Sequence, residues 1–175
     1  MTNADIVRMC QTRLCPTYAR QGVAFVRGQG SRLWDADGKP YLDFFSSLAV
    51  TNLGQCHPAV VKAVSEQMST LVHVANTHHS LPQARLAEAL CAHSFASRVF
   101  FCNSGAEANE AAIKLARKFG AERAGGRYEI ITAFGSFHGR TLATVSATGQ
   151  ERVKQGFLPL LEGFRHVPYD DLAAV

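Results

Sequence analysis

The sequence lacks a long apolar run, a block of like charges and a secretion signal, and each absence excludes a class of protein. No apolar stretch reaches the roughly 18 residues that a membrane-spanning helix needs. The 18 basic residues are scattered among 14 acidic ones, without the clusters that are typical of a nucleic-acid-binding face. Residues 1–5 have no basic segment followed by an apolar one, so no secretory signal is expected.

The cysteines form neither a disulfide framework nor a zinc motif. There are five, an odd number, at irregular spacing and without a C-x-x-C pair, which favours a reducing compartment and predicts a cytoplasmic protein. Cys56-His57 could begin a metal site, but no second ligand pair follows at zinc spacing. No metal is therefore expected.

Two common catalytic signatures are missing as well. The chain has no G-x-x-x-x-G-K-[ST] phosphate loop and no G-x-S-x-G nucleophile elbow, which disfavours nucleotidases and serine hydrolases. What is present is a globular composition, with 47% apolar and 18% charged residues in a chain of 175, enough for one domain with a core.

Residue patterns predict an N-terminal arm and a β-rich segment, which together form a first region, residues 1–55. Residues 2–18 are predicted to form a helical arm, and residues 24–50 a β-rich segment in which Asp37-Gly38 makes a hairpin turn. Apolar residues at helical spacing predict two further helices, over residues 58–68 and 82–93.

In the second region, residues 56–175, strands and helices alternate from residue 99 onward. This order predicts an α/β fold with right-handed crossovers and a parallel sheet, incomplete because few strands are present. On the helix 105–121, Ala108, Ala112, Leu115 and Ala116 are predicted to face the core. The predicted elements are a strand 99–102, a helix 105–121, a strand 128–133, a helix 141–147 and a strand 164–169.

The segment Ser104-Gly105-Ala106-Glu107 opens the helix that follows the first of these strands. Small residues there let a ligand approach the backbone, and the free N–H groups and helix dipole suit a phosphate. The alternative is an ordinary capping box, with Ser104 at the N-cap and Glu107 three residues later. The segment alone favours neither interpretation.

The segment 134–141, Phe-Gly-Ser-Phe-His-Gly-Arg-Thr, follows a second strand and should lie at the same end of the sheet. Phe137 could lie flat against an aromatic ligand, His138 could polarise or orient a group, and Arg140 has the planar fork that binds a carboxylate. The alternative is a glycine-rich turn with a core phenylalanine and a surface arginine. Taken by itself, the segment favours this alternative.

From about Ala24 onward the chain resembles a known family, and four motifs that occur in the family's order carry this resemblance. They are Leu33 to Lys39, Asn52 to Pro58, Phe100 to Arg117 and Phe137 to Thr141. Together they resemble the class III pyridoxal-phosphate-dependent aminotransferases. The resemblance implies the beginning of the large domain of a fold type I pyridoxal-phosphate enzyme, and a homodimer with its active sites at the subunit interface.

The resemblance also implies roles for residues. Ser104, Gly105 and Ala106 would bind the cofactor phosphate, Gly105 and Ala106 through their backbone N–H groups. Phe137 and His138 would contact the cofactor, Phe137 by stacking on its ring, and Arg140 would bind the substrate carboxylate. Residues 46–50 would line the substrate pocket.

The implied reaction moves the terminal amino group of N-acetylornithine to 2-oxoglutarate, in arginine biosynthesis. Ornithine or 4-aminobutyrate is an alternative amine, and a non-catalytic fragment or interaction module is an alternative of another kind. The family needs a Schiff-base lysine, and no lysine here has that context, so no catalytic residue is assigned and the chain alone is predicted to be inactive and poorly soluble. The lysines are Lys39, Lys62, Lys114, Lys118 and Lys154.

Overall fold

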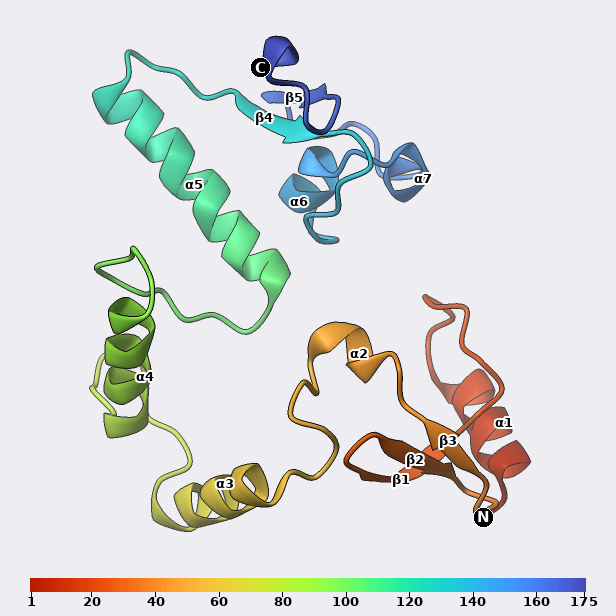
Figure 1. Ribbon diagram of the computed structural model, residues 1–175. Coiled ribbons are helices and arrows are strands. Elements are labelled where there is room, and N and C mark those ends of the chain that lie inside the picture. Colours follow the sequence, from red (N-terminus) through yellow and green to blue (C-terminus); the bar gives the residue numbers. More distant parts are fainter. The chain divides into compact units, whose positions relative to one another are not determined.

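The computed structural model describes residues 1–175, which divide into two compact units, residues 1–79 and 80–175 (Figure 1). The domain boundary that the sequence suggests after residue 55 is not tested by this division and stays a prediction. Each unit is described by itself.

The first unit begins with the helix α1 (Asn3–Arg13) and an antiparallel sheet. Thr2 and Asp5 cap α1 reciprocally, which fixes the start of the predicted arm. Asn3 ties α1 to the sheet region, because its side-chain oxygen accepts the Ala24 N–H at 2.7 Å and its amide donates to the Gly22 carbonyl at 3.0 Å. The strands, in the order β1-β2-β3, are β1 (Phe25–Gln29), β2 (Arg32–Asp35) and β3 (Pro40–Leu42).

Asp35 organises the hairpin turn that Asp37-Gly38 predicts. Its carboxylate accepts hydrogen bonds from the Asp37 and Lys39 N–H groups at 3.0 and 2.9 Å and from the Tyr41 hydroxyl at 3.0 Å. Burial raises the pKa of Asp35, but these three donors outweigh burial and hold the pKa below its ordinary value of 3.8. Gly38 has a φ of 85°, a conformation that glycine adopts without strain.

The rest of the first unit holds α2 (Ser46–Ala49) and α3 (Pro58–Thr70). α2 is a left-handed turn, with φ between 46° and 65° at all four residues. The Asp43 carboxylate holds its start by accepting the Phe45 and Ser46 N–H groups at 3.1 and 2.8 Å. α3 confirms the predicted helix and runs two residues further than Met68.

The second unit contains the predicted parallel strand pair. Ile130 pairs with Phe164 and Ala133 with Val167, so the two strands run in the same direction and end at the same edge. The chain between them forms α6, which confirms the predicted helix, and the short α7. The elements are α4 (Leu81–Ala92), α5 (Gly105–Arg123), β4 (Ile130–Ala133), α6 (Leu142–Ala147), α7 (Glu151–Lys154), β5 (Phe164–Val167) and the 3-10 turn η1 (Leu172–Ala174).

The predicted strand 99–102 does not form, and this expectation was wrong. β4 pairs with β5 alone, and residues 99–102 have no strand beside them to satisfy their backbone groups. Phe100 is 71% exposed and Val99 and Phe101 are only half-buried, so the segment contributes no residue to the core. A strand needs a hydrogen-bonding neighbour as well as the right residues.

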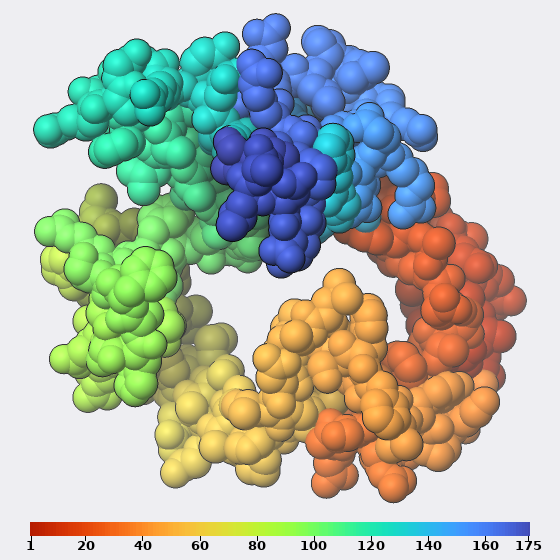
Figure 2. Space-filling model, turned by 45° about the horizontal axis from the view of Figure 1, so that its top comes forward, coloured from red at the N-terminus to blue at the C-terminus, as the bar shows by residue number.

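The core of the second unit lies around α6. Val145 and Ala147 are 4% and 1% exposed, and Thr144 and Thr148 are fully buried. The Thr148 hydroxyl donates to the Thr144 carbonyl oxygen at 2.8 Å, so this polar group is satisfied inside the core. At the other extreme, the C-terminal turn η1, which lies in the dark blue region of Figure 2, is exposed at the surface, and its Leu172 is 89% exposed.

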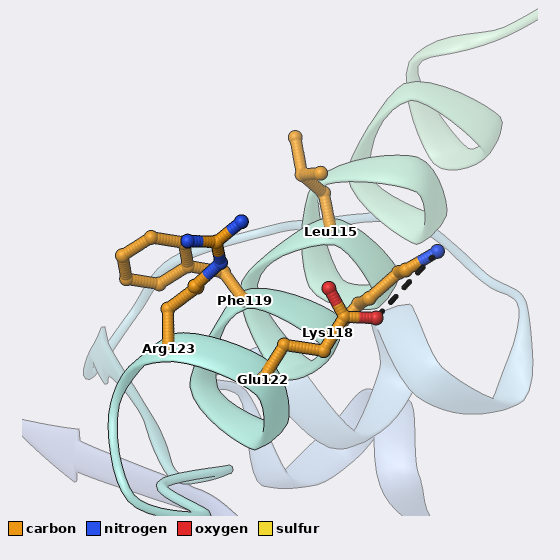
Figure 3. A pocket seen from close by; sticks show the side chains of 5 residues that line it. All are labelled: Leu115, Lys118, Phe119, Glu122 and Arg123. Atoms are coloured by element: carbon orange, nitrogen blue, oxygen red, sulfur yellow. Dashed lines mark ion pairs between the residues drawn. The ribbon is translucent and has the colours of Figure 1, made fainter.

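α5 buries a different face from the predicted one. Ala108, Ala112, Leu115 and Ala116 are exposed, Leu115 by 71%, and Leu115 lines a surface pocket with Lys118, Phe119, Glu122 and Arg123 (Figure 3). The buried positions are Ile113 and Gly120. The spacing of apolar residues predicted burial of the stripe through Leu115, which is the more apolar one. The neighbouring segments instead pack on the stripe that runs from Ala106 through Ile113.

Gly120 shows how close that packing is. A Cβ atom at this position would lie 1.6 Å from the carbonyl oxygen of Arg127, in the segment that leads to β4. Only a glycine leaves room for that approach.

Candidate functional site

The start of α5 presents unsatisfied backbone donors. Ser104 is extended, and its Oγ accepts the Glu107 N–H at 3.2 Å. The first intrahelical bond runs from the Ala108 N–H to the Ser104 carbonyl, which leaves the Gly105 and Ala106 N–H groups without an acceptor in the protein. Gly105 is exposed, and a Cβ atom there would meet nothing within 4 Å. These donors lie at the positive end of a 19-residue helix and are open to an anion.

Only one of the two hydrogen bonds of the predicted capping box forms. Ser104 caps the Glu107 N–H, but the Glu107 carboxylate reaches past the N-cap and accepts the backbone N–H of Asn103 at 2.6 Å and its side-chain amide at 3.3 Å. A carboxylate in the first turn interacts favourably with the helix dipole. It also places a negative charge beside the free donors, where it would compete with a bound anion.

The loop after β4 is held firmly to α6. Gly135 turns the chain with a φ of 74°. The Ser136 Oγ donates to the Ala133 carbonyl at 2.5 Å and accepts the Gly149 N–H at 3.2 Å. The His138 N–H donates to the buried Thr148 hydroxyl at 3.0 Å. The backbone that carries the candidate side chains is therefore anchored in the core of the unit.

The same loop packs directly on the first two turns of α5. The Asn109 side-chain amide donates to the His138 carbonyl oxygen at 2.7 Å. A Cβ atom on the buried Gly139 would lie 2.9 Å from the Ala106 Cβ. The Thr141 hydroxyl donates to the Glu110 carboxylate. The structure thus brings the two sequence motifs, 104–107 and 134–141, into contact.

The candidate side chains on this loop are accessible. Phe137 is 57% exposed and Arg140 is exposed, so Phe137 is not the core residue of the alternative interpretation. His138 is half-buried, with its Nδ1 3.5 Å from the Ser136 Oγ. An aromatic face, an imidazole and a guanidinium therefore follow one another on a loop that contacts the helix start.

Lys154 is the one buried lysine of the chain, 7% exposed, and its burial was not predicted from the sequence pattern. Its Nζ lies 2.9 Å from the exposed Glu151 carboxylate, and this hydrogen bond holds the pKa of Glu151 below its ordinary value. Lys62 and Lys118 form exposed pairs with acidic residues one turn away. Each of these contacts is explained by local charge pairing.

The sequence also missed Asn109 and Glu110, the residues that join α5 to the loop. They are half-buried polar residues at helical spacing from Ala106 and Ile113. Helical spacing could have identified this packed face if polar residues had been counted as well as apolar ones.

Neither a metal cluster nor a membrane-spanning helix is found. No group of three or more histidine, cysteine, aspartate or glutamate side chains is arranged to hold a metal ion. Cys56 is exposed and His57 is the N-cap residue of α3. None of the helices is both long and apolar enough to cross a membrane.

Comparison with known proteins identifies relatives of this chain. The chain is 54% identical over 164 residues to an acetylornithine aminotransferase from Halalkalibacterium halodurans, covering 94% of this chain and 41% of that protein. Among solved structures, an ornithine aminotransferase from Toxoplasma gondii ME49 matches with a TM-score of 0.94 at 28% identity, over 99% of this chain and 42% of that one.

A further structure is informative because of its ligands. A taurine:2-oxoglutarate aminotransferase from Bifidobacterium kashiwanohense, solved in complex with PLP and glutamate, matches with a TM-score of 0.86 at 31% identity over 96% of this chain and 38% of that one. The chain spans about two fifths of the length of the relatives that it matches.

The family model described as aminotransferase class-III matches residues 16–175, nearly the whole chain. The solved structures that resemble this chain are fold type I enzymes that use pyridoxal phosphate. The parallel β4–β5 pair with its connecting helices is part of that fold. The chain therefore belongs to the class III aminotransferase family.

Proposed function

We propose that this chain supplies the cofactor-binding start of an aminotransferase that moves the terminal amino group of N-acetylornithine to 2-oxoglutarate, in arginine biosynthesis. One observation carries the proposal: the loop with Phe137, His138 and Arg140 is fastened to the first turns of α5, whose Gly105 and Ala106 N–H groups lack acceptors. The 54% identity to an acetylornithine aminotransferase supports the choice of amine.

The residues at the helix start fit a phosphate ester. In the proposal, the Gly105 and Ala106 N–H groups donate to the cofactor phosphate, and the open space above Gly105 admits it. The Ser104 Oγ accepts the Glu107 N–H, which leaves its hydroxyl proton free to donate to the phosphate as well.

The residues on the loop fit the ring of the cofactor and the substrate. The accessible face of Phe137 stacks on the pyridine ring. Both backbone groups of His138 are already bonded within the protein, so its imidazole is the part left for the cofactor. Arg140 binds the substrate carboxylate through its planar fork. When bound, pyridoxal phosphate would carry the transferred amino group and supply the electron sink that the reaction needs.

The runner-up is an amine of the ornithine or 4-aminobutyrate type. The TM-score of 0.94 to an ornithine aminotransferase favours it, but identity there is 28%. Side chains, more than backbone course, decide which amine is accepted, so the higher identity to the acetylornithine enzyme weighs more. A non-catalytic fragment is the remaining alternative, and it is consistent with the two fifths of relatives' length that the chain spans.

We also propose that the chain alone does not transaminate. Lys154 is paired with Glu151, and the other lysines are exposed. Incubation of the chain with N-acetylornithine and pyridoxal phosphate should give no more pyridoxamine phosphate than the same mixture without protein. Turnover above that background would contradict this proposal. A cytoplasmic location and a homodimer, both from the family resemblance and composition, belong to the same proposal.

Binding of pyridoxine 5′-phosphate tests the proposed site, because this ligand has the ring and the phosphate but no aldehyde to react with lysines. Equilibrium dialysis should show binding to the unaltered chain. Phe137→Ala should raise Kd about fivefold, from the loss of one aromatic contact of about 1 kcal/mol. Phe95→Ala, at a fully exposed phenylalanine of the same unit, is the matched control and should leave Kd unchanged. Absence of binding at millimolar ligand would refute the proposed site.

A further inference from the structure

α5 contacts the loop at three points within two turns. Ala106 packs against Gly139, the Asn109 amide bonds the His138 carbonyl at 2.7 Å, and the Glu110 carboxylate accepts the Thr141 hydroxyl. The three contacts involve loop residues on both sides of Arg140. The helix that carries the free N–H donors therefore also fixes the backbone on which Phe137 and Arg140 stand.

The Asn109 bond is the contact that a substitution can remove most cleanly. The His138 carbonyl has no other donor within the protein, while its N–H is held separately by Thr148. Loss of the Asn109 amide would leave the His138 carbonyl oxygen without a donor in a half-buried position. A loop conformation that turns this oxygen toward water would then have the lower free energy.

The Glu110 contact acts at the other end of the loop. Thr141 is the N-cap residue of α6, and its N–H donates to the Thr144 hydroxyl at 3.0 Å. The Thr141 hydroxyl donates its one proton to the Glu110 carboxylate. α5 thereby holds the point where the loop ends and α6 begins.

We propose that Asn109 and Glu110 are positioning residues that set the distance between the phosphate-binding start of α5 and the side chains of Phe137 and Arg140. They touch neither cofactor nor substrate and act through the backbone of the 137–141 loop. This inference rests on the proposed function for the identity of the ligand, but the loop contacts themselves do not depend on it.

The test compares two ligands on the same variants. Inorganic phosphate uses only the donors of the helix start, whereas pyridoxine 5′-phosphate also needs a correctly placed Phe137. Asn109→Leu keeps the approximate size of the side chain and removes the donor. We expect its Kd for pyridoxine 5′-phosphate to rise about fivefold, while Kd for inorganic phosphate stays within twofold.

Glu110 offers a rescue by a conservative change. Glu110→Leu removes the acceptor of the Thr141 hydroxyl and should change the ratio of the two Kd values about as much as Asn109→Leu. Glu110→Gln keeps an acceptor oxygen and should restore the ratio. Glu122→Leu, an exposed position about three turns further along α5, removes the same charge and should leave the ratio unchanged.

Hydrogen exchange of the His138 and Thr141 amides, which donate to the Thr148 and Thr144 hydroxyls, gives a second readout that needs no ligand. It should become faster in Asn109→Leu and Glu110→Leu and stay slow in Glu122→Leu and Glu110→Gln. Equal loss of both ligands, an unchanged ratio in the Leu variants, or unchanged exchange would overturn the inference. If the unaltered chain binds neither ligand, the proposed function fails, and the exchange rates alone decide the positioning role.

Discussion

The side-chain amide of Asn109 donates a 2.7 Å hydrogen bond to the carbonyl oxygen of His138, 29 residues away in the sequence. This bond joins a helix whose first N–H groups are open to a loop with an accessible aromatic ring and a guanidinium. Neither motif is enough for a site by itself. A helix start binds many anions without distinguishing them, and a glycine-rich turn has no intrinsic preference for a ligand. Their contact is the observation that supports the proposed binding of a phosphate and a flat ring at one place.

Gly139→Ala should destabilise the second unit by about 2 kcal/mol. Gly139 has a φ of 135°, and its new Cβ would lie 2.7 Å from the Thr144 Oγ1 and 2.9 Å from the Ala106 Cβ. Gly135→Ala is the matched control, with a φ of 74° and open space, and should lose only about 1 kcal/mol of backbone strain. Urea unfolding followed by circular dichroism measures both, and equal losses would show that crowding at Gly139 is unimportant.

Gly105→Ala should change stability and binding in opposite directions. The methyl group meets no protein atom, and alanine favours a helix over glycine, so the free energy of unfolding should rise by up to about 0.5 kcal/mol. Because Cα–Cβ bonds tilt toward the helix start, the methyl stands beside the free donors. Kd for pyridoxine 5′-phosphate should rise at least about fivefold. Unchanged affinity in dialysis would place the phosphate elsewhere.

The first unit should lose stability in acid through Asp35. Its carboxyl has a folded pKa below the ordinary value of 3.8, so its contribution is fully present above that value and is lost as pH falls through the folded pKa. Asp35→Asn should lower the thermal midpoint at pH 7 and reduce its fall between pH 4 and 2. Asp5, Asp43 and Glu151 also have lowered pKa values, so some acid dependence should remain. An acid profile identical to that of the unaltered chain would contradict this account.

The exposed apolar face of α5 should make the chain self-associate. Leu115 and Phe119 are 71% and 61% exposed on one side of the helix, with Lys118 and Glu122 beside them (Figure 3). Leu115→Ser with Phe119→Ser should reduce association in sedimentation velocity and leave the unfolding midpoint nearly unchanged. Ile113→Ser, on the buried face, should instead destabilise the unit. A monodisperse unaltered chain at high concentration would contradict the expectation.

Local chemistry was readable because it depends on neighbours in sequence. The start of α5 at Ser104, the Asp37-Gly38 turn and the start of α6 near Thr141 all follow from residue types within a few positions. The parallel pairing of β4 and β5 followed from the alternation of strands and helices.

Two errors had a common cause. Residues 99–102 have the composition of a strand but no partner strand, and the apolar stripe through Leu115 has no covering segment. Periodicity reports which face could be buried, whereas burial itself depends on what lies opposite.

By itself, then, the sequence determined the family and the order of most elements, and it supplied the residues of the proposed phosphate, ring and carboxylate contacts. Tertiary structure alone decided that Asn109 and Glu110 hold the loop, that the face from Ala106 to Ile113 is the packed one, and that Lys154 is buried. The physical reason is that caps and turns are satisfied within a few residues, whereas side chains that bridge distant segments reveal their partners only when the chain has folded.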